Sequence, residues 1–441
     1  MKKNTRIFIL CYPHFGMLDN WIPVIDSMQA LDKSLKFTLI IPNAMICRNF
    51  DKNNAVIKIS DQIFDTILIH AYDEKWIQQS SLESTIEWYQ SNNIFLRLMD
   101  ILKRFVEKSP IFRILILPLA ILYKKVFKNE IYVDYKYIYK SILETDILLY
   151  DIHNEENNKL LNVLQMFRYN KYSLPHALSM LLDKDADSII YKKNNIKNRN
   201  NIKLYIYAKF QNSFYKEKYG VDKNKIHVVG IPRHDKKWIK KIQKESTNLP
   251  NKFNSNKSVI ILSRHVSEVH CTFDEKVRSI KNIKKIFIDK LGMRLVIKLH
   301  PSEKKERIFS SKYEAVYEDI LGSDNYGKNW IYSDLHIFAL GKDKKLVINL
   351  NTGVVFDIVA MGIPCIDYVD SDREELAKFT MHGDIVENAS NYKELSNYVN
   401  SWIENPCKIS QSSTNTYRQY FPRYDSISTI IASEILNEAR G

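Results

Sequence analysis

A histidine followed by a proline separates an apolar run from a basic run in MRLVIKLHPSEKKERI, the stretch from Met293 to Ile308. The apolar run Arg294–Leu299 predicts a strand, His300 and Pro301 predict a turn, and a helix is expected from Ser302. The amides of a first helical turn, together with the helix dipole, bind anions. A histidine beside them can hydrogen-bond a phosphate or give a proton to a leaving group. A surface histidine that only caps a turn would leave the same pattern.

A second charged group follows an apolar run in VVGIPRHDKKWI, which extends from Val228 to Ile239. Its glycine and proline predict a tight turn. Directly after this turn stands Arg233, whose planar guanidinium suits bidentate binding of a phosphate. A surface ion pair between Arg233 and Asp235 that holds the loop is the structural alternative.

A third candidate site lies in LVINLNTGVVFDIVAMGIPCIDY, which extends from Leu346 to Tyr368. The predicted strand ends in Asn351, Thr352 and Gly353, and a helix is expected to follow. Hydroxyl and amide donors at a helix start can bind an anion. A plain helix N-cap would have the same residues.

Two histidines are candidates for a general base, which would take the proton of an acceptor hydroxyl. His176 follows a proline in RYNKYSLPHALSML, and His14 follows the first predicted strand. Ser263, Arg264 and His265 follow the first strand of the second half, and we expect them near a donor. All these residues stand at carboxyl ends of predicted strands, where α/β folds bind ligands.

The elements that position these residues are short apolar runs that alternate with longer amphipathic ones, a pattern typical of parallel sheets with crossover helices. It predicts strands at Arg6–Cys11, Phe37–Ile41, Thr66–Ile69, Asp146–Tyr150, Lys203–Tyr207, Ile226–Val229, Ser258–Ser263, Arg294–Leu299, Leu346–Leu350 and Pro364–Tyr368. SISTIIASEILNE, from Ser426 to Glu438, predicts an amphipathic helix.

The fold class predicted is α/β, with two Rossmann-like, doubly wound domains facing a central cleft. The first domain is expected over residues 1–245, with a helical insertion at about 80–141. A polar, asparagine-rich linker is expected at 246–257 and the donor domain at 258–415. A C-terminal helix is expected over 416–441, where it can return to the first domain.

The composition indicates a globular protein with an anionic partner. The chain has 441 residues, a formal net charge of +14 and five cysteines that form no CxxC pair. Such scattered cysteines predict neither a disulfide framework nor a zinc knuckle, and a reducing cytosol is expected. The charge suits a membrane surface, a phosphorylated substrate or nucleic acid. No run reaches the 18 or so apolar residues needed to span a bilayer.

The segment Ile111–Tyr123, IFRILILPLAILY, has basic residues on both sides. It can lie in an anionic membrane surface, or it can be a buried helix with solvated ends. We therefore expect the protein in the cytoplasm, peripheral on the inner face of the cytoplasmic membrane.

Metal-binding patterns are weak, and no cofactor is expected to be required. Asp183-Lys184-Asp185-Ala186-Asp187 and Asp370-Ser371-Asp372 both contain the Asp-x-Asp pair that can hold a divalent metal. The first lacks the glycine and distal glutamate of an EF-hand loop. The second follows a predicted strand. His265 and His270 have no third zinc ligand nearby.

Together, GIPRHD, KLHP, NTGVVFDIVAMGIPCI and the Pro-His of SLPHALS resemble the CDP-glycerol glycerophosphotransferases of teichoic acid and capsule synthesis. That family has a Gly-x-Pro-Arg-x-Asp loop, a His-Pro pair and a Ser-Ser-x-x-x-Asp helix start. The His-Pro and Ser/Thr motifs are also similar to those of polysialyltransferases and capsular Kdo transferases, which use CMP-sugars. The resemblance covers roughly Arg168 to Tyr368. It implies the two-domain glycosyltransferase-B (GT-B) fold.

The resemblance also implies roles for single residues. His300 and Thr352 would hold the donor phosphate, Arg233 could assist, and His176 would be the base. The family's His-Gly-Thr-Pro is here Pro175-His176-Ala177-Leu178, and its paired serines are Asn351-Thr352. These departures leave an eight- or nine-carbon acid sugar, or another nucleotide sugar, open as the donor.

The predicted function is therefore a metal-independent transferase that uses a cytidine-activated donor and a glycan or lipid-linked acceptor to build a bacterial surface polysaccharide. A sugar-nucleotide 2-epimerase of the same fold is an alternative, but it needs acidic residues in the cleft. A UDP- or GDP-sugar glycosyltransferase is another. A nucleic-acid-binding role is not expected, because no zinc finger, RRM signature or basic helix with interleaved aromatics occurs.

Overall fold

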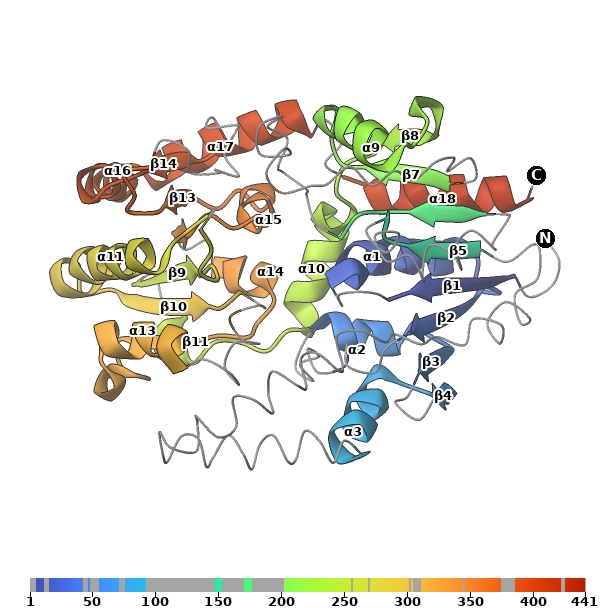
Figure 1. Cartoon of the computed structure of the whole chain (residues 1–441), viewed down its shortest axis with the longest axis horizontal. Coiled ribbons are helices and arrows are strands. Elements are labelled where there is room, and N and C mark those ends of the chain that lie inside the picture. The colour runs from blue at the N-terminus through green and yellow to red at the C-terminus, as the bar shows by residue number, and fades with distance from the viewer. Residues whose placement is uncertain are drawn as a thin grey trace.

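The computed structural model of the chain describes residues 5–11, 16–42, 47, 55–70, 76–92, 147–152, 170–176, 202–254, 257–268, 270–300, 303, 311–343, 346–373, 385–421 and 425–440. These residues form two domains, each built on one sheet with helices packed against it (Figure 1). Two doubly wound α/β domains, as predicted from the alternation of apolar runs, are confirmed.

The first sheet has eight strands in the order β4-β3-β2-β1-β5-β6-β7-β8. Among the strands that the structure describes in this sheet, only the β3–β4 pair is antiparallel. Since the strand order reverses beside β1, the carboxyl ends of β1 and β5 form a switch point of the kind that binds ligands. The strands are β1 Arg6–Leu10, β2 Lys36–Ile41, β3 Thr66–His70, β4 Trp76–Gln79, β5 Ile147–Tyr150, β6 Lys171–Ser173, β7 Ile202–Ile206 and β8 Ile226–Val228.

The second sheet has six parallel strands in the order β11-β10-β9-β12-β13-β14. This is the Rossmann order, with its switch point between β9 and β12. Strands β9 and β13 are buried at every position because helices pack against this sheet. The strands are β9 Ser258–Leu262, β10 Arg294–Lys298, β11 Trp330–Tyr332, β12 Val347–Asn349, β13 Cys365–Tyr368 and β14 Glu387–Ala389.

The helices connect these strands and cover them. In the first domain they are α1 Gly16–Leu31, α2 Ala55–Asp61, α3 Leu82–Asn92, α9 Asn212–Tyr219, the 3-10 turn η5 Pro232–His234, and α10 Lys236–Glu245. In the second they are α11 Phe273–Ile283 with its π-helical extension η7 Lys284–Lys290, α13 Ser311–Leu321, α14 Ile337–Leu340, α15 Val355–Ala360 and α16 Tyr392–Glu404. Helices α17 Pro406–Tyr420 and α18 Ile427–Arg440 end the chain.

The two domains share one apolar core. Helix α10 buries Trp238 and Ile242, and the same cluster of buried residues includes Phe338 of α14 and Phe356 of α15. Helix α17 extends along the second domain toward the first, and α18 lies on α1 of the first domain (Figure 1). The interface between the domains is therefore a packed one.

The predicted strands agree with the structure to within about two residues at each end. The pattern missed β4, β6, β11 and β14, which have three or four residues each. Between α10 and β9, where the linker was expected, the chain forms a short 3-10 turn at Asn251–Phe253. Of the insertion expected at about 80–141, only α3 lies in the described residues; the segment Ile111–Tyr123 lies outside them. Across the C-terminal range, α17 ends at Tyr420 and a separate helix, α18, begins at Ile427.

A single carboxylate in the first domain caps α18. The two carboxylate oxygens of Asp235 accept hydrogen bonds from the backbone amides of Ile427 and Ser428, both at 2.8 Å. We expect Asp235→Ala to lower the free energy of unfolding by about 2 kcal/mol, because two buried amides lose their acceptor. Urea unfolding followed by circular dichroism measures this change. Asp222→Ala is the matched control, since Asp222 is exposed and makes no side-chain cap; equal losses in both variants would contradict the prediction.

Candidate active site

The residues predicted to bind the donor meet at the carboxyl edge of the second sheet. The rings of His265 and His300, which follow β9 and β10, lie with their centroids 4.8 Å apart. Arg264 donates a hydrogen bond of 2.8 Å to the backbone carbonyl of Asn351, which follows β12. Residues from three neighbouring strand ends thus form one cluster, as their positions in the sequence predicted.

A buried glutamate holds this cluster together. Glu303 accepts hydrogen bonds from the Ser263 hydroxyl at 2.8 Å and from the backbone amide of His300 at 2.7 Å. The Lys276 ammonium, which is 1% exposed, forms an ion pair with the same carboxylate. The Ser263 hydroxyl also accepts from Tyr317 at 2.7 Å. Ser263 therefore links the loop after β9 to the loop after β10. Its hydroxyl is already hydrogen-bonded to two side chains, those of Glu303 and Tyr317.

The turn after β12 is held by side chains of its own sheet. Asn351 has a left-handed backbone, with φ of 52°, and its backbone amide donates to the Asp367 carboxylate at 2.9 Å. The Thr352 hydroxyl donates to the side-chain oxygen of Asn349 at 2.6 Å. Asn349 in turn donates to Asp367 at 3.0 Å. Gly353, at the start of the turn into α15, is half-buried, whereas Asn351 and Thr352 are buried.

The electrostatics of this edge favour an anion. Burial lowers the pKa of Arg264 to about 10, so its guanidinium remains charged at neutral pH. Burial, and then the neighbouring Arg264 charge, lower the pKa of His265. Its Nδ1 is buried and has no hydrogen-bond partner among the described residues. A neutral imidazole beside a fixed cation can donate a hydrogen bond to a phosphate oxygen. Because the ring is uncharged, the site does not bear the desolvation cost of a second buried charge.

The first domain places a carboxylate against the candidate base. The Nδ1 atom of His176 hydrogen-bonds to Oδ2 of Asp151, and the backbone amide of His176 donates to the same oxygen at 2.9 Å. Asp151 directly follows β5 and is fully buried, whereas the His176 side chain is 25% exposed. A buried carboxylate orients an imidazole and stabilises its protonated form, as in other His–Asp pairs.

The turn that carries His176 is clamped from three further elements. Asn20 of α1 donates to the backbone carbonyls of Pro175 and His176 at 3.0 and 3.1 Å. The Tyr207 hydroxyl, after β7, also donates to the Pro175 carbonyl. Arg233 of η5 makes a long hydrogen bond of 3.5 Å to the His176 carbonyl. These contacts hold the candidate base in one position relative to the sheet.

Arg233 lies at the domain interface, and it does not form the surface pair with Asp235 that was the structural alternative. Its Nε donates to Asp357 of α15 at 2.7 Å, and its Nη2 donates to the other carboxylate oxygen at 3.2 Å. Asp235 instead caps α18. That alternative is wrong because α15 brings Asp357 to the guanidinium, which is only 12% exposed.

Some predicted site residues lie outside the described residues. His14 and Pro301 are among them, as is the Asp183–Asp187 segment. Of the other Asp-x-Asp pair, Asp370 accepts from Arg278 at 3.0 Å and from Asn282 at 2.6 Å. Within the described residues, no three His, Cys, Asp or Glu side chains cluster as metal ligands.

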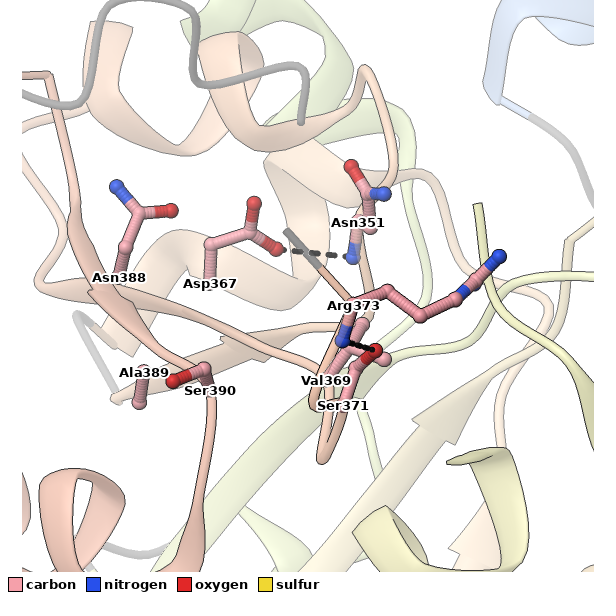
Figure 2. Close-up of a pocket in the computed structure, with 8 residues that line it drawn as sticks. All are labelled: Asn351, Asp367, Val369, Ser371, Arg373, Asn388, Ala389 and Ser390. Carbon is pink, nitrogen blue, oxygen red and sulfur yellow. Dashed lines mark hydrogen bonds between the residues drawn. The ribbon is translucent and has the colours of Figure 1, made fainter. Parts of the chain in front are cut away.

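A pocket adjoins the Asn351 turn at the carboxyl ends of β13 and β14 (Figure 2). It encloses about 330 Å³, part of it open to solvent. The Arg373 guanidinium donates to Glu275 at 2.6 and 2.7 Å, and Asp367 accepts from the Asn351 amide. Both charged side chains in the wall are thus paired within the protein. The lining residues are Asn351, Asp367, Val369, Ser371, Arg373, Asn388, Ala389 and Ser390.

Three carboxylates that organise the site were not singled out from the sequence: Asp151, Glu303 and Asp367. Asp151 carries the signal of an acid one residue past a buried strand. Asp367 could have been noticed as an acidic residue within an apolar strand, since it lies in β13 and is 4% exposed. Glu303 looks like part of a solvated run, and only the fold shows that it is buried beside Lys276.

The sequence matches no protein-family model and no curated protein. Among solved structures, the chain is similar to a variant of the wall teichoic acid polymerase TagF with CDPG, at a TM-score of 0.52 and 12% identity over 100% of this chain and 90% of that chain. It is also similar to the UDP-GlcNAc 2-epimerase from Methanocaldococcus jannaschii, at a TM-score of 0.50 and 13% identity over 99% of both chains. These likenesses establish the fold, and the chain has the two-domain GT-B architecture.

The described part of the chain contains no helix with the length and hydrophobicity needed to span a bilayer.

The Asp357 carboxylate gives the interface a defined dependence on pH. Burial opposes its ionisation, but the Arg233 charge and then His234 outweigh burial and lower its pKa to about 2. A lowered pKa stabilises the fold above the ordinary value near 3.8, and this contribution is lost as the pH falls toward 2.

We therefore expect the difference in unfolding free energy between wild type and Asp357→Asn to be constant above about pH 5 and to shrink by about 2 kcal/mol toward pH 2. Urea unfolding at a series of pH values measures it. Asp324→Asn, at an exposed acid in no ion pair with the described residues, is the control. A difference for Asp357→Asn that does not change with pH would show that Arg233 does not stabilise the ionised carboxylate.

Proposed function

We propose that the protein is a transferase that moves a group from a nucleotide-activated donor to an acceptor hydroxyl, with His176 as the general base. The observation that carries this proposal is the His176–Asp151 pair on the first domain, joined through Arg233 and Asp357 to the helix that follows the Asn351–Gly353 turn. Such a transfer needs a base that takes the proton of the acceptor hydroxyl and an anion-binding edge that stabilises the leaving phosphate.

In the proposed reaction, His176 uses the ring nitrogen opposite Asp151, because Nδ1 is committed to that carboxylate. This Nε2 takes the proton of the acceptor hydroxyl, and Asp151 stabilises the imidazolium. The acceptor oxygen bonds to the donor's anomeric carbon, or to the distal phosphorus of a CDP-alditol. The bond from that atom to the nucleotide oxygen breaks, and its electron pair leaves with the nucleotide phosphate.

The second domain would hold that phosphate. His300 and His265 lie ring to ring at one side of the site, with the Arg264 charge beside them. In the turn before α15, the Asn351 and Thr352 backbone amides donate to Asp367 and Asn349, so Gly353 is the residue of this turn whose amide we propose for the phosphate. Two histidines, an arginine and a backbone amide can stabilise the leaving group, so the proposed reaction requires no metal or other cofactor.

We infer a cytidine-activated donor, either a CMP-linked acid sugar or a CDP-alditol. Two points support this class: the order of the GIPRHD, KLHP and NTGVVFD motifs, and the likeness of fold to a polymerase solved with CDPG. A UDP- or GDP-sugar remains the competing donor, since the same fold also occurs in a UDP-GlcNAc 2-epimerase.

The acceptor in this proposal is a glycan or a lipid-linked chain of a bacterial surface polysaccharide, extended at the inner face of the cytoplasmic membrane. The net charge of +14 and the basic residues that flank Ile111–Tyr123 support an anionic membrane surface as a partner. The phosphate of the nucleotide-activated donor, rather than nucleic acid, is what the histidine cluster would recognise.

A sugar-nucleotide 2-epimerase is less well supported by the geometry. Such an enzyme removes a proton from a sugar carbon, which calls for an acid that can act as a base. Here Asp151 is engaged by His176, Asp357 by Arg233, and Glu303 by Lys276. A carboxylate that is paired in this way positions its partner and is poorly suited to remove a proton from carbon.

Titration of the purified protein with CMP, CDP, UDP and GDP, with and without magnesium, tests the donor class. We expect calorimetry to detect CMP or CDP binding that does not require magnesium. His300→Ala should weaken it about 10- to 100-fold, because a hydrogen bond to a charged phosphate is lost, while circular dichroism stays unchanged. His227→Ala, at a half-buried histidine outside the site, is the control. Preference for UDP or GDP would discard the cytidine donor and keep the fold.

The base assignment has its own test. We expect His176→Ala to lower kcat by about 100- to 10,000-fold, because the proton acceptor is removed, with the Kd for CMP and CDP unchanged. Asp151→Asn should lower kcat in the same direction without affecting binding. Release of nucleotide from CDP-glycerol and from a CMP-linked acid sugar measures turnover. A large loss of nucleotide affinity in His176→Ala would contradict its role as base.

A further inference from the structure

A chain of polar side chains crosses the interface between the two domains. It joins three residues of the first domain to three of the second, and each contacts the next. Because it passes close to both the candidate base and the donor-binding turn, its role bears on the function proposed above. Its members are Asp19, Arg233 and His234 from the first domain, and His336, Asp357 and Tyr417 from the second.

The centre of this chain is the fork between Arg233 and Asp357. Two parallel hydrogen bonds, of 2.7 and 3.2 Å, join the guanidinium to both carboxylate oxygens. His234 adds a bond of 2.6 Å from its Nε2 to Asp357, and its Nδ1 lies 2.5 Å from the Tyr417 hydroxyl. The Asp357 side chain is 5% exposed and that of His234 is 1% exposed. A buried fork of this kind fixes orientation as well as distance.

The other end of the chain joins α1 to the start of α14. His336 Nε2 lies 3.1 and 3.2 Å from the two oxygens of Asp19. Its Nδ1 accepts from the backbone amide of Phe338 at 3.2 Å, which leaves the ring proton on Nε2, directed at Asp19. Asp19 is also 4.0 Å from Nη1 of Arg233. Arg233 thus lies between carboxylates from both domains.

Arg233 also contacts the two halves of the candidate active site. Its Nη1 reaches the backbone carbonyl of His176. Its partner Asp357 is the third residue of α15, the helix that follows the Asn351–Gly353 turn. One guanidinium therefore links the turn that bears the base to the helix that begins beside the donor-binding residues.

We propose that Arg233 is a positioning residue: through its fork with Asp357 it sets the placement of His176 relative to the donor-binding turn, and it does not bind the donor phosphate. This inference rests on the proposed function. It replaces the role of phosphate ligand considered for Arg233, because Nε and Nη2 are occupied by Asp357. A lysine cannot replace this residue, since an ammonium is a point charge that lacks the planar fork.

The test compares Arg233→Lys and Arg233→Gln with wild type. Because displacement of a reacting group by about 1 Å can cost about 100-fold in rate, we expect both variants to lose about that much in kcat. The Kd for CMP and CDP should not change in either. Arg278→Lys, which alters an exposed arginine paired with Asp370, is the matched control and should behave as wild type. Wild-type kcat in Arg233→Lys, or a Kd raised about tenfold or more in either variant, would overturn the proposal.

A readout that needs no substrate separates this proposal from the proposed function. In protein labelled with ¹³C in the histidine rings, His176→Gln identifies the His176 signal. We expect that signal to shift in Arg233→Lys and in Asp357→Asn, although Asp357 belongs to the other domain, and to stay in place in Arg278→Lys. Circular dichroism and thermal melting confirm that each variant is folded, and Asp357→Glu substitutes for Asp357→Asn if the latter unfolds.

The outcomes remain distinct. If wild type binds no cytidine nucleotide and releases none from either donor, the proposed function fails, and the His176 signal alone then decides the positioning role. If that signal is the same in wild type, Arg233→Lys and the folded Asp357 variant, the fork does not position His176 and the proposal is overturned.

Discussion

The buried fork between Arg233 and Asp357 is the contact on which the arrangement of the two domains depends. Burial of either charge alone is costly, so each requires the other, and the pair can form only when α15 of the second domain lies against η5 of the first. The lowered pKa of Asp357 follows from this contact. The shared apolar core around Trp238, Phe338 and Phe356 supplies the contact area, and the fork selects one orientation among those that such a core would allow.

Inside each domain, too, a buried carboxylate fixes the position of a residue or a turn that takes part in the proposed reaction. Asp151 orients His176, Glu303 fixes the turn of His300, and Asp367 fixes the turn of Asn351. In each case the acid accepts from a backbone amide of that turn. The carboxylates therefore act on the position of the chain. In the proposed site, this leaves the imidazoles of His265 and His300 and the Arg264 guanidinium to meet an anionic donor.

Hydrogen bonds from the surrounding helices and strands hold the loops of the proposed site in place. The Pro175–His176 carbonyls are held from α1, from the chain after β7 and from η5. The edge proposed to bind the donor is held by Lys276 and Tyr317, from α11 and α13. A site held by helices and strands loses little entropy when a ligand binds. The helix α18, capped by Asp235, adds a further tie between the end of the chain and the first domain.

The class of fold, ten of the strands and the edge on which His265, His300 and Asn351 meet could be predicted from the amino-acid pattern. Runs of Ile, Val and Leu that alternate with amphipathic runs form parallel sheets, and residues that follow such strands share one edge. The partners of these residues depend on how the elements pack in three dimensions. The short strands β6, β11 and β14 exist because neighbours pair with them, and Arg233 binds Asp357 rather than Asp235 because α15 is packed against η5. Contacts between residues 124 positions apart in the chain leave no local pattern to read.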